Sequence, residues 1–161
     1  MHTAYLGLGT NLGRREENLR KALSALEQHV GKLLKCSSFM ETAPWGFPSD
    51  NAFLNAVAML QTNLSPSDLL AATRQIEISM GRINKTQSAQ YADRTIDIDI
   101  LFYDDLTLNN KDLVIPHPLL CQRLFVLLPL EEIAPELMHP LLHKSIHQLR
   151  IELEKSEKSA I

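Results

Sequence analysis

Three stretches of the chain alternate between apolar and polar residues with a period of two, which is typical of half-buried β-strands. They are residues 3–9, 53–61 and 96–102. The last has the sharpest alternation, because its isoleucines fall on one face while Asp97 and Asp99 fall on the other. A fourth strand is expected at residues 33–40. The alternation therefore predicts a sheet with one strongly apolar face.

Two segments between these strands have the apolar periodicity of helices. Leucines at positions 19, 23 and 26 form a stripe after the first strand. The second helix is expected to begin after Ser65, a residue type that caps helix N-termini, and to end at Gly81. Glu77 lies off its expected buried side, which consists of Leu69, Thr73, Ile76 and Met80. The final residues, 152–161, are expected to form a frayed, solvated tail.

The order strand, helix, strand, strand, helix, strand is that of the split βαβ arrangement in ferredoxin-like α+β folds. We therefore predict a single domain over residues 1–161, with a ferredoxin-like βαββαβ core and C-terminal additions. Both helices would cover one face of an antiparallel sheet. The opposite face would carry Asp97, Asp99, Phe53 and Asn55. Because that face is neither covered nor uniformly polar, we expect the functional site there.

Composition narrows the classes of function. A formal charge of −3 over 161 residues argues against nucleic acid as the main partner, because such domains usually carry a basic surface. Cys36 and Cys121 are too few for a disulfide framework or a zinc site. The N-terminal residues lack the basic start and apolar run of a signal peptide, and no stretch is apolar enough for a transmembrane helix. We expect a soluble cytoplasmic protein with no membrane partner.

Asp97 and Asp99 are the first candidates for chemistry. Two carboxylates two residues apart on a strand project to the same side and can share a cation. Oxygen ligands suit Mg²⁺, whose coordination is usually completed by water and substrate phosphates. The alternative is an exposed strand face whose charges serve solubility, although aspartate is disfavoured in strands. The short D-x-D pattern alone leaves both interpretations open.

The residues just before this pair are rich in cations. Between positions 74 and 94 the local net charge is +2, from Arg74, Arg82, Lys85 and Arg94 against Glu77 and Asp93. Cations beside a metal-binding carboxylate pair suit phosphoryl transfer, because they neutralise charge on the phosphate oxygens. Each of these residues could instead be a solvated loop charge. Arg94 is the exception, since it lies three residues before Asp97 and must be near the carboxylates.

Histidines and glycines supply weaker candidates. His117 lies between two prolines and could reach a phosphate or adenine, or could be an ordinary turn histidine. Pro140 interrupts the helical spacing that would join His139, His143 and His147 in a metal site. The glycines of residues 7–13 do not have the dinucleotide-binding spacing, and we expect a tight turn there that allows close backbone approach.

Aromatic residues could recognise a flat ligand. Trp45, Phe53 and Phe125 are candidates to stack on a heteroaromatic ring, and Asn55 offers a donor and an acceptor for its edge. The alternative for the aromatics is core packing, which the residues favour for Phe125 because it lies in the apolar segment 124–130.

Several segments follow one another in an order that is specific in combination: AYLGLGTNLG, SSFMETAPWG, FLNAVAML, IEISMGR, RTIDIDILFYDD, VIPHP and RLFVLLPLEEIAPEL. Along nearly its whole length the chain resembles the 6-hydroxymethyl-7,8-dihydropterin pyrophosphokinase family of the folate pathway. The resemblance implies a usually monomeric enzyme that transfers the pyrophosphoryl group of ATP to the pterin hydroxymethyl group and releases AMP. It also implies two Mg²⁺ ions, held by Asp97 and Asp99, that bridge the ATP phosphates.

The resemblance also implies roles for residues outside the acidic pair. The catalytic loop arginines fall at Arg82 and Arg94. Further ATP-site positions fall at Glu77, Lys85, His117 and Arg123. The pterin pocket falls at Thr42, Ala43, Pro44, Trp45, Phe53, Asn55 and Phe125. In this pocket Phe125 and the Trp45 region would sandwich the ring, which replaces the core interpretation of Phe125.

The chain departs from the family pattern in its loop and at one pocket position. The family commonly has Trp-Gly-Pro-Arg before the acidic pair, where this chain has Tyr91-Ala92-Asp93-Arg94. Asp93 therefore adds a negative charge beside the phosphates. Position 53 is often tyrosine, and Phe53 retains the ring but lacks the hydroxyl.

Two other classes of function are possible for such a fold. One is a non-catalytic ferredoxin-like module that binds a small ligand, because a fold alone does not determine function. The acidic pair with Arg94 beside it disfavours this class, since a simple sensor has little need of both. The other is an ATP-dependent small-molecule kinase with a different acceptor, which would release ADP instead of AMP.

Overall fold

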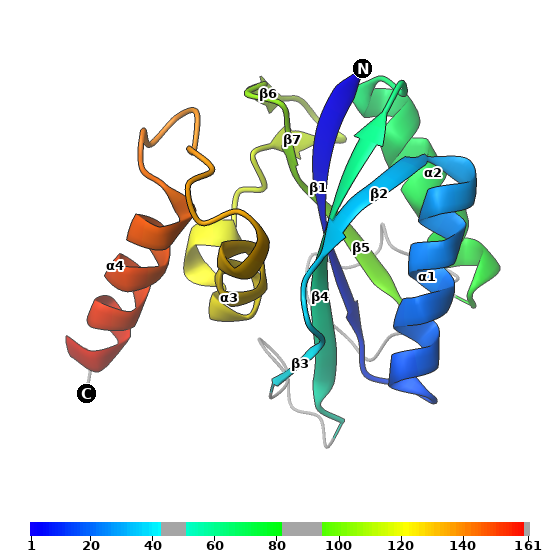
Figure 1. Cartoon of the computed structure of the whole chain (residues 1–161), viewed down its shortest axis with the longest axis horizontal. Coiled ribbons are helices and arrows are strands. Elements are labelled where there is room, and N and C mark those ends of the chain that lie inside the picture. The colour runs from blue at the N-terminus through cyan, green and yellow to red at the C-terminus, as the bar shows by residue number, and fades with distance from the viewer. Residues whose placement is uncertain (43–50, 82–94, 160–161) are drawn as a thin grey trace.

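The structure is a computed structural model that describes residues 1–42, 51–81 and 95–159. Its elements alternate between strands and helices before a helical C-terminal part (Figure 1). In chain order they are β1 (His2–Thr10), α1 (Arg15–His29), β2 (Gly31–Cys36), β3 (Met40–Thr42), β4 (Phe53–Thr62), α2 (Pro66–Ser79), β5 (Asp97–Tyr103), β6 (Leu108–Asn109), β7 (Val114–Ile115), a 3₁₀ helix (Leu120–Gln122), α3 (Leu124–Ile133) and α4 (Ile146–Ser159).

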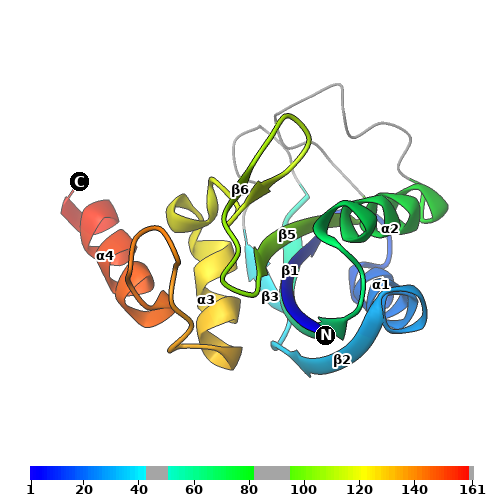
Figure 2. The same cartoon turned by 90° about the horizontal axis from the view of Figure 1, so that it is seen from above.

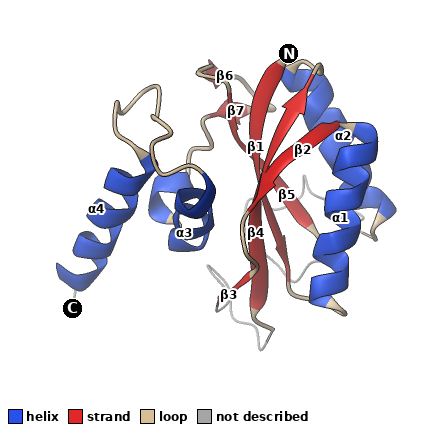
Figure 3. Ribbon diagram, viewed as in Figure 1, coloured by secondary structure: helices blue, strands red, loops and turns tan. Residues whose placement is uncertain are grey.

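The main sheet is antiparallel, with strands in the order β2-β4-β1-β5 and β3 paired to the end of β4 (Figure 3). The α+β class predicted from the sequence is therefore confirmed. Strand β1 is central, and its register decides which functional side chains become neighbours. Gly9 lies between Asn55 of β4 and Asp97 of β5, and Gly7 lies between Val57 and Asp99.

Helices α1 and α2 cover one face of the sheet, as the alternation predicts (Figure 1). Ser65 caps α2 by accepting a hydrogen bond from the Asp68 N–H at 3.2 Å, and Pro66 occupies its first position. In the core on this side, every second residue of the strands packs against the apolar stripes of the two helices. This core includes Ala4, Leu6, Leu8, Leu19, Leu26, Leu69, Ile76, Ile98 and Ile100.

Helices α3 and α4 lie on the opposite side of the sheet from α1 and α2 (Figure 2). Here the strand residues Tyr5, Val57 and Leu101 share a second core with helical residues that include Leu120, Val126, Leu127, Leu130, Ile146 and Leu149. The expectation of an uncovered second face is therefore wrong for the part beneath α3. The apolar segment 124–130 has no partner identifiable from the sequence, and this helix supplies the missing layer.

Three local predictions are also wrong. The strand expected at residues 33–40 is broken at Ser37, whose N–H donates to the Val57 carbonyl while its Oγ accepts from the Val57 N–H. The expected tight turn at residues 7–13 is mostly strand, and only Gly13 has a left-handed backbone, with φ of 68°. The expected frayed tail continues α4 to Ser159, because its residues still follow a helical pattern.

Among the described helices, none combines the length and the apolar character needed to cross a membrane.

Candidate active site

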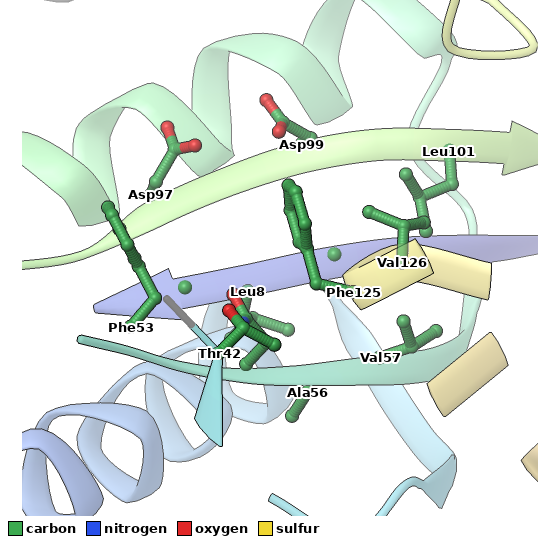
Figure 4. A pocket seen from close by; sticks show the side chains of 13 residues that line it. Leu8, Thr42, Phe53, Ala56, Val57, Asp97, Asp99, Leu101, Phe125 and Val126 are labelled. Carbon is green, nitrogen blue, oxygen red and sulfur yellow. The ribbon is translucent and has the colours of Figure 1, made fainter. Parts of the chain in front are cut away.

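A pocket opens on the second face of the sheet, beside α3 and at the ends of β1, β4 and β5 (Figure 4). Most of the lining is apolar, with carboxylates at one edge. The residues around it are Gly7, Leu8, Gly9, Thr42, Phe53, Asn55, Ala56, Val57, Asp97, Asp99, Leu101, Phe125 and Val126.

Gly7 and Gly9 of β1 line the base of the pocket and place no side chain in it. A Cβ atom on Gly9 would lie 3.0 Å from Asn55 Oδ1 and 3.6 Å from Phe53 Cδ1, so a side chain there would intrude on both. On Gly7 the nearest atoms would be those of Leu101 at 3.5 Å, an ordinary contact. Gly9 is not among the site residues expected from the sequence, although the G-x-G spacing on an alternating strand puts both glycines on the face of Asp97.

Asp97 and Asp99 project from β5 on the same side of the pocket (Figure 4). The prediction that alternation places both carboxylates on one face is therefore confirmed. Asp97 is only 4% exposed, so its carboxylate is largely removed from bulk water. Their donor chemistry fits Mg²⁺, because two carboxylates on one strand leave the other coordination positions to water and phosphate oxygens.

Asp99 is accompanied by cationic or protonatable groups. Arg123 Nη1 lies 3.7 Å from Asp99 Oδ2, and its guanidinium carbon lies 5.8 Å from the centre of the Phe125 ring. His117 Nε2 lies 4.0 Å from the same Asp99 oxygen. His117 Nδ1 accepts a hydrogen bond from the Leu119 N–H at 3.2 Å, so a neutral ring carries its proton on Nε2 and directs it toward Asp99.

The opposite part of the pocket combines the polar side chains of Thr42 and Asn55 with two aromatic rings. Asn55 is 4% exposed, and its Nδ2 donates to Thr42 Oγ1 at 2.8 Å. This bond leaves Oδ1 on the side of Gly9. The rings of Phe53 and Phe125 point toward the edge formed by the two aspartates (Figure 4). The arrangement can enclose a flat ligand with a polar edge.

Glu77 is not where its helix pattern placed it. It is buried on α2 at 1% exposure, facing β5, and its Oε2 accepts a hydrogen bond from the Ile98 N–H at 2.8 Å. The expectation that Glu77 lies off the buried side is therefore wrong. A carboxylate is an unusual core residue, and the N–H of Ile98 on the neighbouring strand gives it a hydrogen-bond donor.

Several predicted site residues have no structural description. Ala43, Pro44, Trp45, Arg82, Lys85 and Arg94 lie outside the described residues. The structure therefore brings together Thr42, Phe53, Asn55, Asp97, Asp99, His117, Arg123 and Phe125, with Glu77 beneath β5.

The C-terminal histidines form no metal cluster. Within residues 1–42, 51–81 and 95–159, no group of three or more His, Cys, Asp or Glu side chains is placed to hold an ion. His139 instead packs edge-on against Phe102, and its Nδ1 accepts from the N–H groups of Leu141 and Leu142. His147 contacts Glu131 at 2.9 Å.

The chain was compared with known protein families and curated proteins. The sequence model of the 7,8-dihydro-6-hydroxymethylpterin-pyrophosphokinase (HPPK) family matches residues 5–135. The chain belongs to the HPPK family. A 2-amino-4-hydroxy-6-hydroxymethyldihydropteridine pyrophosphokinase from Porphyromonas gingivalis is 47% identical over 141 residues, which cover 87% of this chain and 95% of that protein. A protein of the same name from Bacillus subtilis is 41% identical over 134 residues, 83% of this chain and 78% of that protein.

The fold is also that of solved HPPK structures. The Plasmodium falciparum HPPK-DHPS wild-type crystal structure superposes with a TM-score of 0.80 at 20% identity, over 99% of this chain. This chain corresponds to 46% of that longer chain. At this identity the likeness concerns the fold alone.

HPPK membership distinguishes the classes of function left open by the sequence. It supports an enzyme of pyrophosphoryl transfer in folate biosynthesis, and it does not favour a non-catalytic ligand-binding module. HPPK enzymes are kinases that use ATP and generally need Mg²⁺, and this agrees with a carboxylate pair at the edge of a largely apolar pocket.

Proposed function

We propose that the chain transfers the pyrophosphoryl group of ATP to the hydroxymethyl group of 6-hydroxymethyl-7,8-dihydropterin, giving the pterin diphosphate and AMP. The observation that carries this proposal is the juxtaposition in one pocket of two aromatic rings and the Asp97–Asp99 pair. A flat acceptor between the rings would have its reactive group beside the carboxylates. The names of the curated relatives support the choice of acceptor.

In the proposed complex the pterin occupies the apolar part of the pocket. Phe53 and Phe125, which both line the pocket, are proposed to contact its ring faces, in place of the sandwich of Phe125 and the Trp45 region that the resemblance implies. At the ring edge, Asn55 Oδ1 can accept a hydrogen bond, and the Asn55 N–H that is not donated to Thr42 can donate one. The resemblance to the family extends this pocket to Ala43, Pro44 and Trp45. A substituent on the bound ring can then lie toward β5.

Asp97 and Asp99 are the residues proposed to hold Mg²⁺, with two ions as the family resemblance implies. Bound magnesium would neutralise charge on the ATP phosphates and orient them. The low exposure of Asp97 keeps water away from its carboxylate and strengthens its attraction for a cation. Arg123 and His117 lie beside Asp99, where they can donate to phosphate oxygens.

The reaction requires little covalent chemistry from the protein. The pterin hydroxyl oxygen forms a bond to the β-phosphorus of ATP, and the bond from that phosphorus to the oxygen shared with the α-phosphorus breaks. AMP departs with that oxygen, and the hydroxyl proton passes to water. Holding the two reactants in line and neutralising charge are the main contributions. Arg82 and Arg94 are proposed to neutralise the phosphates, with Lys85 at the ATP site, and we assign no general base.

Further parts of the proposal concern the whole chain. The core is interpreted as ferredoxin-like, since its sheet order β2-β4-β1-β5 and two helices on one face agree with that arrangement. We propose a single domain over residues 1–161 that acts as a cytoplasmic monomer. Its partners would be ATP and the pterin, without nucleic acid or membrane.

The acidic pair provides the test. Asp97→Ala should abolish AMP formation from ATP and the pterin at saturating Mg²⁺, and circular dichroism should show an intact fold. The matched control is Asp112→Ala, which removes an exposed aspartate in the turn between β6 and β7 and should leave AMP formation unchanged. Near-normal activity of Asp97→Ala would refute the assignment of this pair as the metal site.

A further inference from the structure

The strand that carries the acidic pair lies at the edge of the described sheet. Strand β5 pairs with β1 on one side, in the order β2-β4-β1-β5. Its other edge faces α2, where Glu77 Oε2 accepts the Ile98 N–H at 2.8 Å. Edge strands expose backbone groups and are held less firmly than central strands. The side chain from α2 therefore takes the place of a neighbouring strand at this point.

The alternation of an antiparallel pair makes this contact specific for the acidic pair. Successive residues direct their backbone groups alternately toward the partner strand and away from it. Since the Ile98 N–H is directed away from β1, the backbone groups of Asp97 and Asp99 are directed toward β1, opposite Gly9 and Gly7. The three-residue segment is thus held at one edge by β1 and at the other by Glu77.

Burial indicates how Glu77 acts. Glu77 is 1% exposed, in the layer between α2 and the sheet, whereas Asp97 and Asp99 line the pocket on the opposite face. Burying a carboxylate is costly unless it is hydrogen-bonded, and the N–H of Ile98, which lies between the two aspartates in the sequence, supplies such a bond.

We propose that Glu77 is a positioning residue for the metal site. It holds the Ile98 peptide, and through it fixes the direction in which Asp97 and Asp99 leave the strand. This inference rests on the proposed function, since it assumes that the two aspartates bind a metal–nucleotide complex. It differs from a direct contact between Glu77 and ATP, because the predicted action passes through the backbone of β5. Groups that orient metal ligands typically change metal affinity or activity about 10- to 100-fold when they are removed.

Two conservative substitutions distinguish the length of the Glu77 side chain from its charge. Glu77→Gln keeps a carbonyl oxygen at the same distance and loses the charge, whereas Glu77→Asp keeps the charge and is one methylene too short. Thr73→Ala, one turn earlier on the same buried side of α2, is the control for a general loss of helix packing. Thermal unfolding of all variants gives the temperature at which each is fully folded.

The first readout is hydrogen exchange of the Ile98 amide, measured by NMR without any ligand. We expect loss of protection in Glu77→Asp and retained protection in Glu77→Gln and Thr73→Ala. The second is binding of Mn²⁺, as a probe for Mg²⁺, in the presence of a non-hydrolysable ATP analogue, measured by electron paramagnetic resonance. We expect Mn²⁺ affinity to fall about 10- to 100-fold in Glu77→Asp and to stay near wild type in Glu77→Gln.

The opposite ranking, with Glu77→Gln impaired and Glu77→Asp normal, would overturn the positioning role in favour of a requirement for charge. Equal Mn²⁺ affinity in wild type and Glu77→Asp would overturn the positioning role alone. If the wild-type protein itself bound no Mn²⁺ with the analogue, the proposed metal site would be refuted and the positioning role with it. The wild-type titration therefore distinguishes failure of the inference from failure of the proposed function.

Discussion

At the residue scale, the shape of the pocket depends on the two glycines of β1, Gly7 and Gly9, which place no side chain in it. Gly9 separates Asn55 from Asp97 across three strands, and Gly7 separates Val57 from Asp99. A ligand can therefore approach the backbone of the central strand between an amide on one side and carboxylates on the other. The same residues, placed one position along the strand, would point into the core of the opposite face.

Gly9→Ala should selectively impair recognition of the pterin. The new Cβ would lie 3.0 Å from Asn55 Oδ1, so the amide must shift away from its hydrogen bond with Thr42. Overpacking of this kind costs about 1–3 kcal/mol, so we expect the KM for the pterin to rise about tenfold or more while the KM for ATP changes little.

The matched control is Gly7→Ala, two residues away on the same face of the same strand. Its Cβ would meet Leu101 at 3.5 Å, an ordinary contact, so we expect the KM for the pterin to rise much less than in Gly9→Ala. A Gly7→Ala enzyme as impaired as Gly9→Ala would show that the effect is a general response of β1, unrelated to Asn55.

At the element scale, α3 converts one end of an open sheet face into a pocket. Its first turn carries Phe125 and Val126 to the lining, while Leu127 and Leu130 bury against the second core. Near its other end, Glu132 accepts the Ser38 N–H at 3.0 Å and the Ser38 hydroxyl at 2.8 Å. This contact joins α3 to the break between β2 and β3.

Glu132→Ala should loosen α3 on the sheet. Hydrogen bonds to a charged acceptor contribute about 1 kcal/mol at such an exposed position, and the unfolding temperature should fall by a few degrees. Because α3 carries Phe125, we expect a rise of the KM for the pterin that exceeds any fall in kcat. Glu136→Ala, which removes another exposed carboxylate just beyond α3, is the control and should behave like wild type.

Sequence patterns predicted the elements of the first face and did not predict the second layer. Alternation and capping signals located β1, β4, α2 and β5 because these are local properties of the chain. The apolar segment 124–130 has no such signal for its partner, since its place depends on contacts with strands far away in sequence. Phe125 could be assigned to the pocket only through the family resemblance.

The site shows the same division between local and long-range information. The shared face of Asp97 and Asp99 follows from strand periodicity, which is a property of neighbouring residues. The contacts of Asp99 with Arg123 and His117 depend on how the C-terminal part packs against β5. The hydrogen bond from the Ile98 N–H to Glu77 depends on where α2 packs on the sheet. No pattern within either segment indicates these pairings.

At the scale of the whole molecule, several titratable groups share one sign of pKa shift. Burial, followed by the charge of His143, lowers the pKa of His139 below its ordinary 6.5. Burial raises the pKa of Glu131, but hydrogen bonds from Arg150 and His147 outweigh it, and the net pKa lies below the ordinary 4.5. The unfolded chain therefore binds protons at these groups more tightly than the folded chain does.

We expect the free energy of unfolding to fall as the medium becomes acidic. The loss should begin as the pH falls through about 6.5, where unfolded His139 gains a proton, and should steepen near pH 4.5, where unfolded Glu131 does. Protonation of folded His139 would also remove the acceptor for two backbone N–H groups. Urea unfolding at a series of pH values between 4 and 8 measures the slope (each pKa unit corresponds to about 1.4 kcal/mol).

The Glu131→Gln variant is the control for this prediction. It should lower stability at pH 7 and flatten the dependence on pH below about 5, since the group that titrates is gone. An increase in wild-type stability as the pH falls from 7 to 4.5 would contradict the lowered pKa values assigned to His139 and Glu131.

We propose that the enzyme moves two phosphorus atoms of ATP in one transfer, and the distribution of labelled phosphorus among the products shows whether it does. The protein is incubated with Mg²⁺, the pterin and ATP labelled separately at the α-, β- and γ-phosphorus. We expect β and γ label to appear in the pterin product in equal amounts, and α label to appear in AMP. Transfer of γ label alone, with α label in ADP, would contradict pyrophosphoryl transfer and indicate an ordinary kinase.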